Sequence, residues 1–152
     1  MEFDVLDDLY RDVILDHCRN PRHPDKLKNP DIIADGVNRF CGDEIHLQVT
    51  LDEPGRVTAV GFQGRGCSIN LAAGSMLADV MEGRTLEEIE EISAALNDLM
   101  MGRVPSEEQA KRMGDLAALS GVRQFPVRIK CALLGFSALH DGIRDHRRNR
   151  RG

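Results

Sequence analysis

Three cysteines of this chain stand in sequence surroundings that favour a thiolate over a thiol. Cys41 is separated from Asp43 by a single glycine, Cys67 follows a Gly-Arg-Gly stretch, and Cys131 comes just after two basic residues. Nearby cations and the unpaired amide groups of a helix N-terminus stabilise the charge of a thiolate. If the fold brings the three cysteines together, Asp43 completes a metal site of three sulfurs and one oxygen.

Each cysteine also has a plainer explanation when it is taken alone. The Cys41 pair with its carboxylate could be a chance turn, Cys67 could be a small residue that allows close packing, and Cys131 could be buried beside Val127 and Leu134 on one helix face. The chain has no Cys-x-x-Cys, which excludes the zinc-finger and ferredoxin patterns. The spacing by itself therefore does not show that the cysteines converge.

The fourth cysteine and the histidines are weaker candidates. Cys18 lies at the end of the first expected helix among charged residues, and we interpret it as incidental. His46 falls on the polar face of its expected strand, so we expect it at the surface. Four further histidines stand in charged surroundings and are expected at the surface as well: His17, His23, His140 and His146.

Composition limits the class of protein. The 152 residues are 41% hydrophobic, which fits one folded domain, and the net charge of -5 argues against a general nucleic-acid binder. We expect a single domain over residues 1–145 and a basic, solvated tail over 146–152. With no signal-peptide pattern and no apolar run near the roughly 18 residues of a membrane span, the expected location is the cytoplasm. Thiols stay reduced there, so the cysteines are better candidates for ligands or nucleophiles than for disulfides.

Hydrophobic periodicity predicts the elements that must position these residues. A first amphipathic helix should begin near Asp4 and end by Asn20, because Pro21 follows it. Alternating apolar and polar residues predict a strand over 45–51, and a turn at 52–55 leads into a returning strand over 56–63. Residues 32–37 are a plausible third strand.

The second half of the chain is predicted to be helical. An apolar helix is expected over 68–82, and two capping boxes, at 85–88 and 106–109, indicate the starts of further helices. We expect a short helix over 115–120 and a last helix from Pro126 to about Arg144. A small three-stranded antiparallel sheet packed against a set of helices is an α+β fold.

Several motifs resemble the SufU/IscU family of iron–sulfur cluster assembly proteins, which includes NifU N-terminal-like domains. The resemblance covers nearly the whole chain except the basic tail, and it implies an IscU-like fold. It rests on four segments: Tyr10-Arg11 through Asp16-His17, Asn20-Pro21-Arg22, Asn38 to Asp43, and Gly64 to Ile69.

Two features look specifically like the SufU branch of that family. The stretch from Gly114 to Val122, continuing to Cys131, is similar to SufU, which carries an inserted segment before its last cysteine; residues from about 102 to 122 look like that insertion. IscU has a histidine immediately before its third cysteine. This chain has Lys130 there, which cannot be a ligand while it is protonated.

The resemblance implies a ligand set for a metal. Cys41, Asp43, Cys67 and Cys131 would bind Zn²⁺ tetrahedrally, and three thiolates with one carboxylate suit zinc. Such a site is negatively charged overall. The neighbouring cations Arg128 and Lys130 would offset that charge and tune the site or a partner contact.

The resemblance further implies an enzyme, a zinc-dependent sulfurtransferase. SufU-like proteins take sulfur from a PLP-dependent, SufS-like cysteine desulfurase, and the acceptor corresponds to Cys41. A partner group would replace Cys41 as a metal ligand, and the freed thiolate would attack the terminal sulfur of the desulfurase persulfide. Asp43 would be the ligand that guides the proton or the released thiolate. A downstream iron–sulfur assembly scaffold would receive the sulfur.

Two other functions fit the same residues. The protein could be a scaffold that assembles a [2Fe–2S] cluster on Cys41, Asp43, Cys67 and Cys131, in which case iron would replace zinc. It could instead be a structural zinc module that only binds a partner, in which case no thiol would become reactive. Metal content separates the first alternative from the sulfurtransferase, and alkylation of Cys41 in the presence of the desulfurase separates the second.

Overall fold

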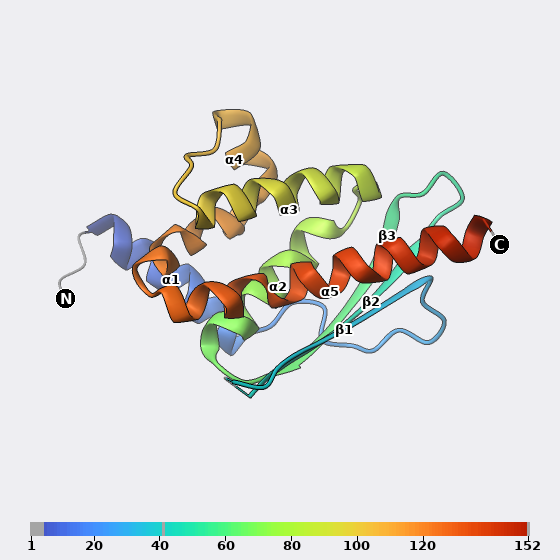
Figure 1. Ribbon diagram of the computed structural model, residues 1–152, viewed down its shortest axis with the longest axis horizontal. Coiled ribbons are helices and arrows are strands. Elements are labelled where there is room, and N and C mark those ends of the chain that lie inside the picture. Colours follow the sequence, from blue (N-terminus) through green and yellow to red (C-terminus); the bar gives the residue numbers. More distant parts are fainter. Residues whose placement is uncertain (1–4, 41, 152) are drawn as a thin grey trace.

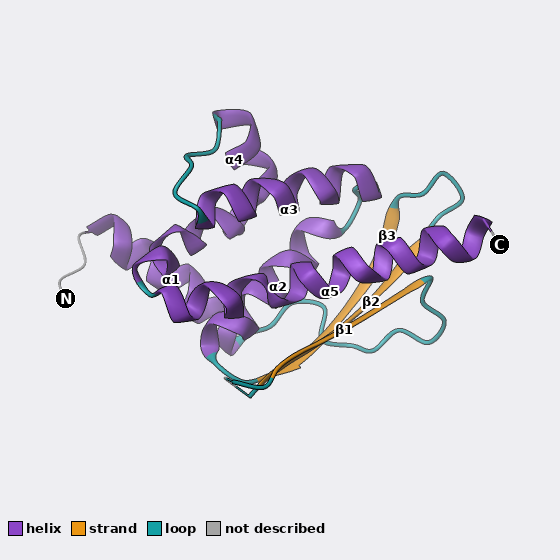
Figure 2. Cartoon of the chain, viewed as in Figure 1, coloured by secondary structure: helices purple, strands orange, loops and turns teal. Residues whose placement is uncertain are grey.

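The fold is a three-stranded sheet with helices layered on one of its faces (Figure 1, Figure 2). The computed structural model describes residues 5–40 and 42–151, with side chains described for 11–40 and 42–149. Helix α1 (Val5–Arg19) is followed by strands β1 (Ile32–Asn38), β2 (Asp43–Leu51) and β3 (Val57–Arg65). The α+β class and the three antiparallel strands predicted from the sequence are confirmed.

The sheet has the order β1-β2-β3, so each strand pairs with its neighbour in sequence. Asn38 lies opposite Asp43 at one end of the β1–β2 pair, and Glu44 lies opposite Arg65 at the same end of the β2–β3 pair. Alternation along β2 sends Ile45, Leu47 and Val49 into the core. The turn between β1 and β2 and the end of β3 therefore lie together at one end of the sheet.

The helices that follow β3 cover the apolar face of the sheet. Helix α2 (Ser68–Met81) is buried along most of its length, and α3 (Leu86–Met100) lies above it in Figure 1. Both predicted capping boxes are confirmed, at Thr85 with Glu88 and at Ser106 with Gln109. The second box opens α4 (Glu107–Met113).

Two helical predictions need correction. Residues 115–120 were expected to form a short helix, but they are part of a longer 3₁₀ segment, η1 (Gly114–Gln124). The last helix was expected to end near Arg144, but α5 (Pro126–Arg151) continues through the basic segment. One contact supports the extension, because the Arg147 guanidinium lies 2.6 Å from the Glu90 carboxylate and so pairs this part of α5 with α3.

Within the described part of the chain, no helix is both long enough and apolar enough to cross a membrane. The loop between α1 and β1 packs along β3, where the Phe62 N–H donates to the His23 carbonyl at 2.7 Å and the Gln63 side chain donates to the Pro24 carbonyl at 3.1 Å. This loop ties the end of α1 to the sheet.

Candidate metal centre

Four elements converge at the end of the sheet that carries the β1–β2 turn. The start of β2, the end of β3, the start of α2 and the first turns of α5 meet at the lower left of the molecule in Figure 1. They bring together Asp43 from β2, Cys67 from the residue before α2, and Cys131 from α5. One potential ligand atom from each of these side chains lies within 4.8 Å of the others. We call Asp43, Cys67 and Cys131 the metal centre.

Asp43 and Cys67 are joined directly. The Cys67 backbone N–H donates to Asp43 Oδ1 at 2.8 Å, and the Cys67 sulfur lies 3.8 Å from Oδ2. Cys67 is the N-cap of α2, and its sulfur accepts from the Asn70 N–H at 3.5 Å. The sequence predicted that Cys67 stands where a glycine loop meets a helix, and a thiolate at that position gains from the unpaired amides and the helix dipole.

Gly66 makes this approach possible. Its φ of +121° is a backbone conformation that other residues rarely adopt, and a Cβ there would collide with the Asp43 carboxylate. The chain thus folds back over Asp43 at a position where only glycine leaves room. Gly66, the second glycine of the Gly-Arg-Gly stretch before Cys67, is therefore a geometric requirement of the centre.

Cys131 is fully buried, while its helix neighbour Val127 is 72% exposed. The plainer explanation, burial of Cys131 beside Val127 and Leu134, is right for Cys131 and for the partly buried Leu134 but wrong for Val127. Cys131 points to Asp43 and Cys67.

Arg128 contacts the sulfurs of the centre, as the sequence suggested. A hydrogen bond to Cys131, followed by the attraction of Cys67, raises the pKa of the Arg128 guanidinium further above its already high ordinary range. Arg128 therefore stays charged beside the two sulfurs. Lys130 is exposed and has neither a hydrogen bond nor an ion pair among the described residues, so no contact supports its expected role in tuning the site.

The expected fourth ligand, Cys41, lies outside the described residues, so the structure does not test its place in the site. The three described residues nevertheless fit a metal. Asp43 is completely buried, and among the described residues no cationic side chain forms an ion pair with it. A buried carboxylate without a counter-charge is costly, and a cation held between it and two sulfurs removes that cost. Sulfur and carboxylate donors together suit zinc.

The sequence missed a second polar cluster, on the middle of α2. His17 was expected at the surface, but it is fully buried between α1, α2 and η1. Its Nδ1 lies 2.8 Å from the Ser75 hydroxyl and its Nε2 lies 2.8 Å from the Asp115 carboxylate. We call His17, Ser75 and Asp115 the His17 cluster. Its members lie 58 and 98 positions from His17 in the sequence, so no local pattern could reveal it.

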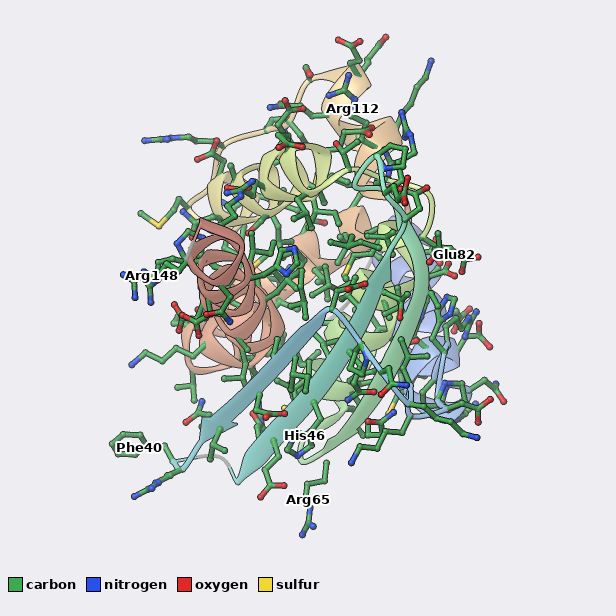
Figure 3. All side chains as sticks on the ribbon, turned by 90° about the vertical axis from the view of Figure 1, so that its right-hand side faces the viewer. Phe40, His46, Arg65, Glu82, Arg112 and Arg148 are labelled. Carbon is green, nitrogen blue, oxygen red and sulfur yellow. The ribbon has the colours of Figure 1, made fainter. Side chains whose placement is uncertain are left out.

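The surface next to the metal centre is apolar. Phe125 and Val127 are exposed and, with Ile69 and Arg128, they line an open recess of about 660 Å³. Phe40, almost fully exposed, points away from the body at the same end of the sheet as His46 and Arg65 (Figure 3). Exposed aromatic and aliphatic side chains beside a reactive site are typical of a protein contact surface.

Comparison with known proteins gives a consistent result. Residues 9–132 match the family model of the NifU-like N terminal domain. The chain is 41% identical over 138 residues to the zinc-dependent sulfurtransferase SufU of Bacillus subtilis, covering 91% of each protein. It is 35% identical over 146 residues to the iron–sulfur cluster assembly scaffold protein IscU of Streptococcus pyogenes, covering 95% of this chain and 88% of that protein.

Solved structures share the fold. The SUF-system protein FiSufU of Fervidobacterium islandicum AW-1 superposes with a TM-score of 0.76 at 26% identity, covering 86% of this chain and 93% of that one. The N-terminal part of a NifU-like protein from Brucella abortus superposes with a TM-score of 0.82 at 25% identity, covering 95% and 99%.

Proposed function

This chain belongs to the NifU-like N-terminal domain family, and on that premise we propose that it is a zinc-dependent sulfurtransferase of iron–sulfur cluster assembly. It takes sulfur from a cysteine desulfurase onto Cys41 and passes it to a downstream assembly scaffold. The observation that carries the proposal is the convergence of Asp43, Cys67 and Cys131 within 4.8 Å at one end of the sheet.

The proposal assigns different roles to the four ligands. Cys67 and Cys131 come from the start of α2 and from α5, and Asp43 comes from the first residue of β2, so rigid elements hold all three. Cys41 is the fourth ligand and lies between β1 and β2 in the sequence. When bound, zinc keeps its sulfur ligands deprotonated at neutral pH.

The chemical step is a thiol–persulfide exchange at Cys41. Its thiolate attacks the terminal sulfur of the desulfurase persulfide, the sulfur–sulfur bond of that persulfide breaks, and the desulfurase cysteine leaves as a thiolate. A new sulfur–sulfur bond forms at Cys41, so the exchange needs no outside oxidant or reductant. Arg128 supplies a permanent positive charge beside the sulfurs. Asp43 guides the Cys41 thiolate when it leaves the metal.

The partner is proposed to be a PLP-dependent desulfurase of the SufS type. The exposed side chains of Phe125 and Val127 beside the centre offer an apolar contact surface for it. A desulfurase and its acceptor must share a compartment, and the cytoplasm remains our prediction for this one.

A desulfurase assay tests the function. Zinc-loaded protein should increase the rate of alanine release from cysteine by the desulfurase, and Cys41→Ala should remove that increase. Mass spectrometry should find one added sulfur atom on Cys41 after turnover. Cys18→Ser is the matched control, since Cys18 lies outside the metal centre and should leave both results unchanged.

Stimulation by Cys41→Ala equal to that of the wild type would overturn the proposal. An increase in the alkylation of Cys41 when the desulfurase is added separates an acceptor from a structural zinc module, because only an acceptor exposes a thiol to its partner.

A cluster scaffold is the second candidate, because relatives that cover most of this chain are named IscU scaffold proteins. The same donor set could hold a [2Fe–2S] cluster. Protein purified without oxygen decides between the two, since iron with visible charge-transfer bands favours the scaffold and zinc favours the sulfurtransferase. Two features favour the sulfurtransferase: Lys130 stands before Cys131, and α4 with η1 fills the segment that resembles the SufU insertion.

A further inference from the structure

Asn70, in the first turn of α2, makes three contacts around the metal centre. Its side chain is 1% exposed. The side-chain Nδ2 donates to the Glu44 carbonyl at 3.0 Å and to the Arg65 carbonyl at 3.1 Å, and its backbone N–H donates to the Cys67 sulfur at 3.5 Å. One residue thus binds the start of β2, the end of β3 and the cap of α2.

The two carbonyls that Asn70 holds lie next to metal ligands. Glu44 and Arg65 face each other in the β2–β3 pair. Glu44 directly follows Asp43, and Arg65 is separated from Cys67 by Gly66 alone. A shift of either strand end would therefore change the separation between the Asp43 carboxylate and the Cys67 sulfur.

The amide of Asn70 is suited to this place and not to general packing. Both of its Nδ2 neighbours are acceptors, so the nitrogen must face them, and its NH₂ group has one hydrogen for each carbonyl. Its Oδ1 is buried and has no hydrogen-bond partner among the described residues. A half-satisfied buried amide costs stability. An apolar residue would lack that cost but would give up both of these hydrogen bonds.

We infer that Asn70 is a positioning residue of the metal centre, which fixes the separation between Asp43 and Cys67. The inference deepens the proposed function and rests on it in one respect, that the centre binds zinc. Asn70 is not a ligand in this inference. It acts through the backbone on either side of two ligands, as groups beyond the ligand shell do in other metal sites.

The test compares Asn70→Ala with Gln48→Ala in the full-length protein. Gln48 is a matched control because it is also a buried amide, its Nε2 donates to Gln63 at 2.9 Å, and its Oε1 likewise lacks a partner among the described residues. Chelator competition should show zinc affinity lowered by about 10–100-fold in Asn70→Ala. Gln48→Ala should change zinc affinity by less than about twofold, because it lies away from the centre.

Cobalt provides a readout that does not depend on sulfur transfer. The visible bands of Co²⁺ bound in place of zinc report the arrangement of its ligands, and they should shift in Asn70→Ala but not in Gln48→Ala. Urea unfolding of both metal-free variants should show similar losses of stability. Equal stability losses with unequal metal affinities would separate positioning from general packing.

A second variant covers the case in which Asn70→Ala does not fold. Asn70→Ser suits the first turn of a helix, but its single hydroxyl hydrogen cannot serve two carbonyls. Lower zinc affinity and shifted cobalt bands in Asn70→Ser support the inference, whereas wild-type values in either folded variant overturn it. Failure of the wild type itself to bind zinc would instead overturn the proposed function.

Discussion

Helix α2 carries two buried polar clusters, and they differ in how completely their members satisfy one another. In the His17 cluster, the Ser75 hydroxyl accepts from the Arg22 N–H at 2.8 Å and meets one ring nitrogen of His17, while Asp115 meets the other. Every hydrogen-bonding atom of the imidazole has a protein partner.

The metal centre lacks this completeness. Asp43 is as buried as His17, but its described contacts are a backbone N–H and a sulfur, and no cationic side chain pairs with it in the described part of the chain. The comparison teaches that burial of a polar group does not by itself indicate function. The His17 cluster completes its own hydrogen bonds and so joins α1, α2 and η1, whereas the metal centre places two sulfurs and a buried carboxylate close enough together to hold a cation.

The largest expected effect is that of zinc on stability. Free zinc at about a thousand times its Kd should raise the free energy of unfolding by about 4 kcal/mol in the wild type. Zinc should raise the free energy of unfolding of the His17→Ala variant by the same amount, because the contacts that this substitution removes lie outside the metal centre. Urea titrations with zinc and with a chelator measure both. A much smaller increment in His17→Ala would mean that the two clusters are not independent.

The next effect is the loss of a ligand. Asp43→Ala removes the only described oxygen donor of the centre. Mutation of a residue that only supports a ligand lowers metal affinity by up to about 100-fold, so loss of Asp43 itself should lower zinc affinity by more than that. Competition with a metal indicator measures it. His46→Ala is the control, since His46 lies on the same strand with its side chain exposed. Retention of wild-type affinity by Asp43→Ala would remove Asp43 from the ligand set.

A smaller effect should follow from opening the His17 cluster. His17→Ala removes a hydrogen-bond partner of the buried Ser75 hydroxyl. This loss should lower the free energy of unfolding of the metal-free protein by about 1–3 kcal/mol. Zinc affinity should stay within about twofold of the wild type. A large loss of zinc affinity with little loss of stability would reverse the roles that we give to the two clusters.

The smallest effect belongs to the rim of the His17 cluster, where Asp16 pairs with Arg22. The hydrogen bond from Arg22, with a second from Asn20, lowers the pKa of Asp16 below its ordinary value of 3.8. A lowered folded-state pKa contributes stability above the ordinary value and loses it as the pH falls through the folded value. Asp16→Asn should therefore be slightly less stable than the wild type at neutral pH. The two should converge below about pH 3.8 in urea unfolding.

Much of the fold follows from local sequence pattern. Alternation of apolar residues predicted β2, and the turn at 52–55 predicted β3 as the returning strand. The side-chain pairs Thr85–Glu88 and Ser106–Gln109 predicted the starts of α3 and α4. These features depend on residues within a few positions of one another. The end of α5 could not be predicted in this way, because a contact between Arg147 and Glu90 supports it across the fold.

Some residues of the candidate site could also be predicted from local pattern, and others could not. Cysteine type and local charge identified Cys67 and Cys131, and the resemblance to a family joined them with Asp43. Neither local pattern nor the family resemblance could identify Asn70 as a positioning residue. Its proposed role depends on hydrogen bonds to the Glu44 and Arg65 carbonyls, which sequence patterns do not describe. His17 was wrongly expected at the surface because its charged sequence neighbours conceal the partners that bury it.

The pairing of Asn38 with Asp43 limits how far the proposed acceptor can travel. Cys41 is two residues from Asp43 in the sequence, and an extended chain spans at most about 3.6 Å per residue, so the tether is roughly 7 Å long. A segment this short limits the reach of Cys41 to the immediate surroundings of the metal centre. Delivery over any longer distance must come from dissociation and diffusion of the whole molecule, which makes the lifetime of each complex a determinant of sulfur flow.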